Sequence, residues 1–214
     1  MISEFSPGFR LYTGSMFGGK TAKMIFDLQR AVVAGKKVQA FKVSWDNRYD
    51  EGFITANNGQ LKFPAISVSN TFEIEKFLES DVEVLGIDEN QFFDERLVDF
   101  VKKFRDKILI IGTSLQSNFR GEAFALRGSP YDKEVDSKKF TVGDLMALST
   151  DIRQEWPVCT HKDKSGNICG GVAYYPQRWN EDGSLSKYSD KTIVIGAKDK
   201  YAPCCMKHFI KPVD

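Results

Sequence analysis

The sequence predicts an α/β protein in which helices cover both faces of a parallel sheet, followed by a small C-terminal segment of different composition. Short apolar runs alternate with segments of helical periodicity up to about residue 150, which is the pattern of a parallel sheet. A glycine-rich turn joins the first apolar run to the first helical segment. All cysteines and histidines lie beyond residue 151. We therefore expect two domains, residues 1–150 and residues 151–214.

Length and charge limit the classes of function. The chain has 214 residues and a formal net charge of +1, so its charge gives no argument for nucleic-acid binding. No apolar stretch is long enough to span a bilayer, and the first residues lack the basic and apolar regions of a secretory signal. We expect a cytoplasmic protein without a membrane partner. In a reducing compartment its cysteines would be thiols or metal ligands rather than disulfides.

The glycine-rich turn reads G-x-x-x-x-G-K-T, between a predicted strand at Phe9–Thr13 and a predicted helix at Thr21–Ala34. That order is the context of a phosphate-binding loop, although a chance glycine-rich turn is the alternative. It favours a P-loop NTPase-like (RecA-like) sheet. The backbone N–H groups would bind ATP, Lys20 would reach its β- and γ-phosphates, and the Thr21 hydroxyl would ligate Mg²⁺. The ATP-binding turn comprises Gly14, Ser15, Met16, Phe17, Gly18, Gly19, Lys20 and Thr21.

The second predicted strand is Val38–Val43, and a polar, turn-rich stretch follows it at Trp45–Gly59. This stretch is a candidate functional loop because it combines an aromatic residue with Asp46 and Arg48. The alternative for Asp46 and Arg48 is an ordinary surface ion pair, which would stabilise the fold very little.

A pair of acids closes the next strand. A capping box at Asn70 predicts a helix to about Ser80, and the apolar strand Val82–Ile87 then ends in Asp88 and Glu89. An acid at the end of a buried strand, downstream of a P-loop, is the Walker B arrangement. Asp88 would hold Mg²⁺, and Glu89 would take a proton from an acceptor hydroxyl. The alternative is two solvated acids in a turn.

The remaining elements follow the same alternation. We expect a helix at Glu95–Phe104, a strand at Ile108–Gly112, a short helix from Thr141 to about Ser149 and a strand from Ile152 to Val158. Between the second and third of these, the loop 114–124 carries aromatic residues at the same edge of the sheet. They could stack on a base or belong to the core.

The C-terminal segment has six candidate metal ligands. A zinc ion would stabilise a segment that is too small to bury a core of its own. The Cys205-x-x-His208 spacing is typical of zinc sites, but spacing alone does not choose four ligands from the set. The candidates are Cys159, His161, Cys169, Cys204, Cys205 and His208.

Together these strings resemble the type II thymidine kinase family over nearly the whole chain. The P-loop is similar to the family's G-P-M-F-S-G-K-T, and Asp46 to Tyr49 matches D-x-R-Y. Residues 87–93 are similar to I-D-E-A-Q-F-F, and residues 119–124 to F-R-G-E-P-F. In the C-terminal segment, residues 169–178 match the region of the second zinc cysteine. Residues 196–208 match the family's lasso loop and second zinc pair.

The resemblance implies ATP and thymidine as substrates, Mg²⁺ with ATP, and a structural Zn²⁺. It makes Glu89 the catalytic base and places Asp46, Arg48 and Gln91 in functional motifs. A homotetramer and feedback by dTTP are also implied. The implied zinc ligands are Cys159, Cys169, Cys205 and His208. The implied base pocket is Met16, Phe92, Leu115, Phe119, Phe124 and Tyr201. The implied lasso groups that bind the base edge are Thr192, Ile193, Val194, Ile195 and Gly196.

The sequence departs from the family pattern at four positions that the resemblance associates with loops. These positions are Asn57, Gln116, Asn118 and Ala197. None coincides with Lys20, Asp88 or Glu89, so we expect a thymidine kinase that also accepts deoxyuridine and serves nucleotide salvage. Two alternatives are a P-loop ATPase or kinase with another acceptor, and a nucleic-acid-binding protein with a zinc ribbon.

Overall fold

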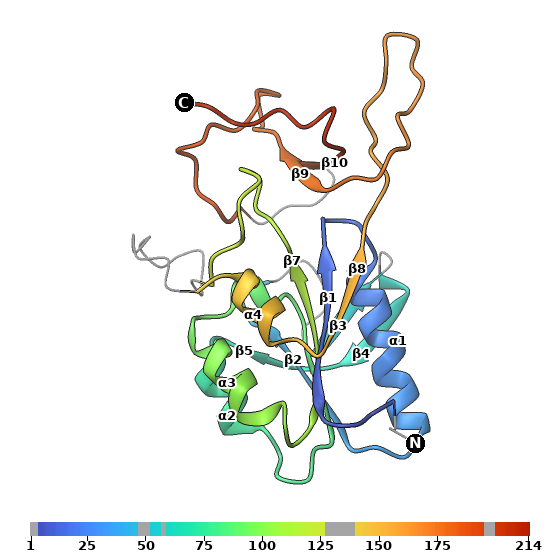
Figure 1. Cartoon of the computed structure of the whole chain (residues 1–214), viewed down its shortest axis with the longest axis vertical. Helices are drawn as coiled ribbons and strands as arrows, with labels where there is room; N and C mark the ends of the chain where they lie inside the picture. The colour runs from blue at the N-terminus through green and yellow to red at the C-terminus, as the bar shows by residue number, and fades with distance from the viewer. Residues whose placement is uncertain (1–3, 47–51, 57–58, 127–139, 195–199) are drawn as a thin grey trace.

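The computed structural model describes residues 4–46, 52–56, 59–126, 140–194 and 200–214 (Figure 1). The helices are α1 (Lys20–Val33), α2 (Thr71–Phe77), the short 3-10 helix η2 (Asn90–Phe92), α3 (Arg96–Phe104) and α4 (Val142–Leu148). The strands are β1 (Gly8–Gly14), β2 (Val38–Val43), β3 (Phe53–Ala56), β4 (Leu61–Pro64), β5 (Ile66–Val68), β6 (Val84–Ile87), β7 (Leu109–Leu115), β8 (Asp151–Glu155), β9 (Tyr175–Arg178) and β10 (Tyr201–Cys204).

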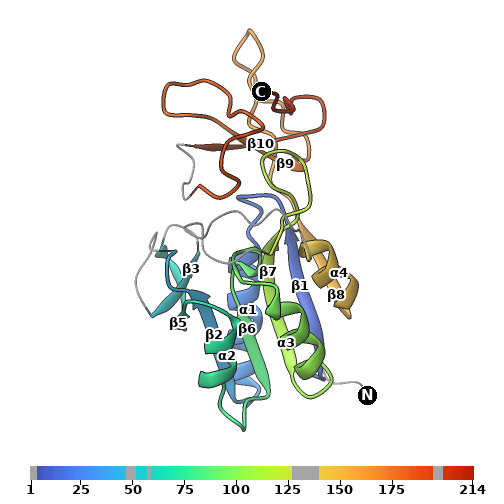
Figure 2. The ribbon, with the colours of Figure 1, turned by 90° about the vertical axis from the view of Figure 1, so that its left-hand side faces the viewer.

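Six strands form one parallel sheet in the order β5-β2-β6-β7-β1-β8. Helix α1 covers one face, and α2, α3 and α4 cover the other (Figures 1 and 2). The fold class predicted from the sequence is therefore confirmed. All carboxyl ends of the strands meet at one edge, which is where ligand sites form in open α/β sheets.

Alternation along the strands divides the core into two apolar layers. In β6, Leu85 and Ile87 pack in the layer under α2, α3 and α4, whereas Val84 packs in the layer under α1. Gly86 also faces α1, and a Cβ atom there would lie only 2.8 Å from Cδ1 of Leu28. This glycine therefore permits the close approach of α1 to the centre of the sheet.

Several predicted elements change in extent. The stretch Trp45–Gly59, expected to be a polar loop, contains β3, which pairs with β4 as a hairpin beside α1. A strand of four residues contains too few alternations of apolar and polar side chains to be recognised among polar residues. Asn70 does cap α2 through a hydrogen bond of 3.1 Å from the backbone N of Glu73, but that helix ends at Phe77 rather than near Ser80.

Strand β8 pairs with β1 along its whole length, so the main sheet continues past residue 150 to Glu155. The division into domains at residue 150 remains a proposal. Beyond β8 the chain forms a long hairpin and the two-stranded sheet β9–β10, which lie over the carboxyl edge of the main sheet (Figures 1 and 2). Among the described residues after α4, only Ile193 packs against either apolar layer.

In the part of the chain that the structure describes, no helix combines the length and apolar character needed to cross a membrane.

Candidate active site

The glycine-rich turn connects β1 to α1 in a conformation that needs its glycines. Gly14 has φ +138° and Gly19, which precedes α1, has φ +86°, a region that side chains rarely adopt. A Cβ atom at Gly14 or Gly18 would lie 2.1 or 2.2 Å from the backbone oxygen of Glu155, at the end of β8. The predicted turn is thus in place, directly at the carboxyl edge and supported by the neighbouring strand.

The buried Lys20 points back into this turn. Its Nζ atom donates a hydrogen bond of 2.6 Å to the backbone oxygen of Ser15. Helix α1 begins at Lys20 with no acidic residue in its first turn, so the positive end of its dipole is not neutralised there. An ammonium group and the N–H groups at the start of a helix, facing one turn, form a site suited to phosphate oxygens.

Asp88 and Thr21 lie together at the end of β6. The Thr21 hydroxyl donates to Oδ1 of Asp88 at 3.2 Å, and the Thr113 hydroxyl donates to the same oxygen at 2.5 Å. Removal from water, followed by the negative charge of Glu89, raises the pKa of Asp88 to about 7. A nearby cation would favour the charged carboxylate, and hydroxyl and carboxylate oxygens are suitable ligands for Mg²⁺.

Glu89 follows Asp88 in a left-handed backbone conformation, with φ 52°. Such a conformation is costly for a residue with a side chain and is typical of functional turns. The backbone N of Glu89 donates to Thr113 Oγ1 at 2.8 Å, and Gln91 Nε2 donates to Glu89 Oε2 at 2.5 Å. The fully buried Gln91 is fixed in turn, since its Oε1 accepts from Ser114 Oγ and the backbone N of Leu115. The Glu89 carboxylate is therefore held in one orientation.

An aromatic cluster lies beside these acids. The rings of Trp45 and Phe92 are 4.8 Å apart, and those of Phe92 and Phe124 are 6.0 Å apart in an edge-to-face arrangement. The rest of the predicted base pocket is close, because Met16, Leu115 and Ile193 belong to or pack against the same apolar layer. Trp45 was expected only as part of a functional loop, and its ring packs against that of Phe92, a residue of the predicted base pocket.

The other predicted pocket residues lie where the C-terminal segment covers the edge. Phe119 is buried, with the guanidinium of Arg178 3.6 Å above its ring. The Tyr201 hydroxyl donates to the backbone oxygen of Val194 at 3.0 Å, and Thr192 Oγ1 accepts from Arg120. Of the remaining predicted residues, Arg48, Ile195 and Gly196 lie outside the described residues. Asp46 follows β2 at the same edge, near enough for its charge to contribute to the raised pKa of Asp88.

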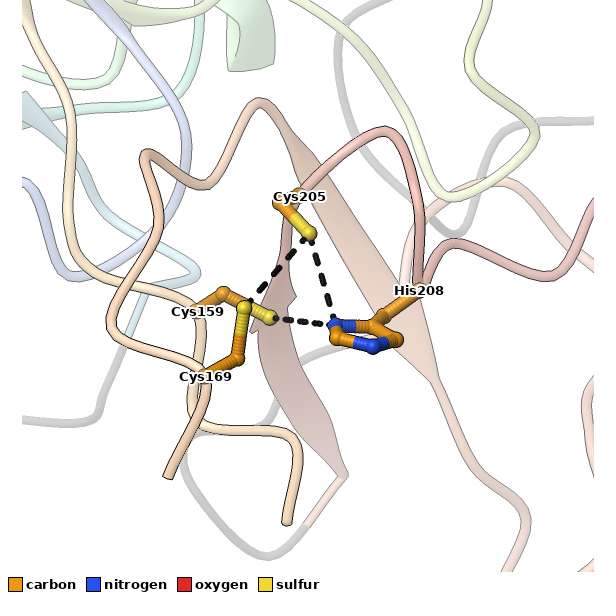
Figure 3. Close-up of side chains that lie close together, drawn as sticks. All are labelled: Cys159, Cys169, Cys205 and His208. Atoms are coloured by element: carbon orange, nitrogen blue, oxygen red, sulfur yellow. Dashed lines mark hydrogen bonds between the residues drawn. The ribbon is translucent and has the colours of Figure 1, made fainter. Parts of the chain in front are cut away.

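Four side chains of the C-terminal segment converge on one point (Figure 3). His208 Nδ1 lies 3.6 Å from Cys159 Sγ and 3.4 Å from Cys205 Sγ, and Cys169 Sγ lies 3.9 Å from Cys205 Sγ. Tetrahedral zinc with Zn–S bonds of about 2.3 Å separates two sulfur ligands by roughly 3.8 Å. The cluster therefore has both the ligand types and the spacing of a structural zinc site.

The two other candidate ligands lie outside this cluster. His161 is in the hairpin between Cys159 and Cys169, and its ring stacks on that of His208 at 4.0 Å between centroids. Cys204 is buried, and burial raises the pKa of its thiol to about 11, which disfavours the thiolate that metals require. Spacing left these choices open, and the geometry selects Cys159, Cys169, Cys205 and His208.

Thr113 is a site residue that inspection of the sequence missed. It stands in the apolar strand β7, buried, and its hydroxyl contacts both Asp88 and the backbone of Glu89. The available signal was a pair of hydroxyl residues, Thr113 and Ser114, in the otherwise apolar strand that follows the two acids. Which strands are neighbours is a property of the sheet order and could not be read from that signal alone.

A comparison with known families agrees with this geometry. A family model described as thymidine kinase matches residues 8–129, which is more than half of the chain and includes the glycine-rich turn, both acids and the aromatic loop after β7. Membership of this family implies that the protein is a nucleoside kinase with ATP as phosphate donor, in agreement with its α/β sheet. On this match, the chain belongs to the thymidine kinase family.

Proposed function

We propose that the protein is a thymidine kinase of nucleotide salvage, which transfers the γ-phosphate of ATP to the 5′-hydroxyl of thymidine and also accepts deoxyuridine. The observation that carries this proposal is the arrangement of three groups of residues along one edge of the main sheet. The turn with Lys20, the acids Asp88 and Glu89, and the aromatic rings of Phe92 and Phe124 follow one another along it. A phosphate site, a base for a hydroxyl and a surface for a planar ring are the three parts that the reaction needs.

Glu89 acts as the general base in this mechanism. Its carboxylate accepts the 5′-hydroxyl proton while the hydroxyl oxygen forms a bond to the γ-phosphorus. The bond from that phosphorus to the β–γ bridging oxygen breaks, and ADP leaves. Gln91 holds the carboxylate through its 2.5 Å hydrogen bond, so the base is oriented before the substrate arrives.

Lys20 and the backbone N–H groups of the turn stabilise the negative charge on the transferring group. Thr21 and Asp88 are the residues that would hold Mg²⁺. Their oxygens are adjacent, since the Thr21 hydroxyl lies 3.2 Å from Oδ1 of Asp88. When bound, Mg²⁺ would supply neutralising charge at the phosphates.

The loop after β7 and the C-terminal segment together supply nucleoside recognition in this proposal. Phe119, Phe124 and Tyr201 provide apolar surface for the base. The main-chain groups of the predicted lasso residues, Thr192 to Gly196, bind its polar edge. Backbone donors and acceptors suit thymine and uracil, whereas the exocyclic amine of cytosine would leave polar groups unpaired.

Zinc, in the same proposal, has a structural role. Cys159, Cys169, Cys205 and His208 would hold it with no position left for a substrate, because four protein ligands complete a tetrahedral site. The homotetramer and the dTTP feedback implied by the resemblance are further proposals. A mass measurement in solution and inhibition by dTTP would test them.

A nucleoside panel tests the proposed function. Transfer of labelled γ-phosphate from ATP is measured for thymidine, deoxyuridine, deoxycytidine and deoxyadenosine in the presence of Mg²⁺. Lys20→Ala serves as the inactive control. We expect product with thymidine and deoxyuridine alone. Product with deoxycytidine alone, or ATP binding without transfer to any nucleoside, would overturn the proposal.

A further inference from the structure

One arginine in the loop that follows β7 forms hydrogen bonds to a segment of the C-terminal region. We call residues 186–194 the stem segment, and its last three residues are among those proposed to bind the base. Arg120 donates to this segment from three nitrogens. Nε bonds the backbone oxygen of Tyr188 at 2.7 Å, Nη2 bonds that of Asp190 at 2.6 Å, and Nη1 bonds Thr192 Oγ1 at 2.9 Å. Figures 1 and 2 show this loop rising from β7 to reach the C-terminal region.

Arg120 is itself fixed on the kinase side. Asn118 Oδ1 accepts hydrogen bonds from the backbone N of Arg120 at 2.8 Å and of Glu122 at 3.2 Å, which closes the loop into a tight turn. The guanidinium lies 5.1 Å from the ring centroid of Phe119 and 4.9 Å from that of Tyr188. The Tyr188 hydroxyl also donates to Glu122 at 2.6 Å. The loop that carries Phe119 therefore fixes the position of the stem segment.

A second arginine holds the stem segment from the C-terminal side. Arg178, which is buried, donates to Ser186 Oγ at 2.7 Å and to the backbone oxygen of Lys191 at 2.5 Å. Its guanidinium also covers the ring of Phe119 at 3.6 Å. Two guanidinium groups therefore fix the stem segment, and the ring of Phe119 lies against both of them.

We propose that Arg120 is a positioning residue that sets the place of Thr192–Val194 relative to Phe119 and thereby determines nucleoside affinity. This inference rests on the proposed function. Within the described part of the chain, the side-chain hydrogen bonds and ring contacts of Arg120 involve none of Lys20, Asp88 and Glu89, so it acts on where the nucleoside binds and not on the transfer step. A lysine cannot replace it, because an ammonium group lacks the planar fork that reaches three acceptors in two directions.

Steady-state kinetics with separate variation of thymidine and ATP tests this role. For Arg120→Ala we expect KM for thymidine to rise about 10- to 100-fold, as the loss of charge-assisted hydrogen bonds implies. We expect KM for ATP, kcat at saturating thymidine and the zinc content to stay within about twofold of wild type. Arg120→Lys should recover only a small part of the affinity. Added guanidinium ion at non-denaturing concentration should lower KM for thymidine in Arg120→Ala, with sodium chloride as the ionic-strength control.

Arg105→Ala is the matched control. Arg105 Nη1 donates to the backbone oxygen of Leu148 at 2.6 Å, so this variant also removes an arginine–carbonyl bond, but between α3 and the end of α4. It should leave KM for thymidine unchanged. An active wild type with an unchanged KM in Arg120→Ala would overturn the inference alone, as would a parallel loss of kcat, ATP affinity and zinc. A wild type that phosphorylates no nucleoside would overturn the proposed function and this inference together.

Discussion

The body of the molecule and its C-terminal segment are stabilised in opposite ways. The body has two apolar layers: Leu85 and Ile110 are fully buried on one face of the sheet, and Val84 and Ile111 on the other. In the described part of the C-terminal segment, the buried side chains include Gln177, Arg178 and Ser186, and each of these makes side-chain hydrogen bonds. The body folds by excluding water, whereas the segment depends on hydrogen bonds and on its Cys/His cluster.

This difference matches a division of labour. The acids and the glycine-rich turn are placed by strands whose positions the apolar layers fix, as catalysis requires. In the proposed function, the C-terminal segment contributes side chains and backbone to the nucleoside side of the same edge, through Tyr201, the stem segment and Arg178. We therefore expect mutations of the acid pair and the glycine-rich turn to alter the transfer step. Mutations in the segment should alter binding of the nucleoside.

The strongest test of this division changes the base. Glu89→Gln keeps the size of the side chain but removes the proton acceptor, so kcat should fall about 10²- to 10⁴-fold. ATP affinity, measured by fluorescence titration, and KM for thymidine should remain close to wild type. A kcat near that of wild type would show that another group accepts the proton.

The second test removes the metal site from the C-terminal segment. Cys205→Ala should abolish zinc binding, because it deletes one of four ligands. Hydrogen exchange should then show loss of amide protection across residues 156–214, with α1 and β1 still protected. Thymidine phosphorylation should fall about 100-fold or more as the nucleoside side of the edge is lost.

Cys204→Ala is the control for that experiment. Cys204 is the neighbouring residue and is buried, but it is not part of the converging cluster. This variant should retain one zinc ion per chain and the exchange pattern of wild type. Loss of zinc in Cys204→Ala, or loss of protection in α1 and β1 of Cys205→Ala, would contradict the separation of the two regions.

A third test concerns the support of Glu89. Replacing Gln91 with Met preserves the approximate shape but removes the donor to Glu89 and the acceptor for Ser114 and Leu115. We expect kcat to fall about tenfold to 100-fold, because a misoriented base loses much of its effect. Single-turnover measurements with saturating substrates would report the transfer step directly. If kcat is unchanged, the orientation of Glu89 does not depend on Gln91.

The smallest expected effect lies in the packing of the body. Asn90 is fully buried, and its amide has no hydrogen-bond partner among the described residues. A Cβ atom at Gly112 would lie 2.2 Å from Asn90 Nδ2. Gly112→Ala should therefore lower the free energy of unfolding by about 1–3 kcal/mol alone. In the Asn90→Ala background most of that loss should disappear. Denaturant titration of the double-mutant cycle measures the coupling, and simple additivity would show that the two side chains do not compete for space.

The sequence predicted the parallel sheet, the glycine-rich turn and the acid pair, because each depends on local pattern. Periodicity located α1 and α3 to within a few residues, and one strand–turn–helix motif located Lys20 and Thr21. It did not reveal β3 and β4, whose four-residue strands lie near polar turns. It also could not show that Thr113 reaches Asp88, or that Arg120 reaches Thr192, because these contacts join residues 25 and 72 positions apart. Contacts of that kind are set by tertiary packing.

The close packing of the Glu155 carbonyl on Gly14 and Gly18 has an evolutionary consequence. Each of these glycines is required by the neighbouring strand for reasons of space, apart from any phosphate that the turn binds. A descendant of this chain that had lost kinase activity would still be selected to keep them, as long as β8 remained in the sheet. Conservation of the two glycines among relatives would therefore indicate that the sheet, including β8, is conserved. Retention of Lys20 and Thr21, which have no such steric constraint, would be the better record of nucleotide use.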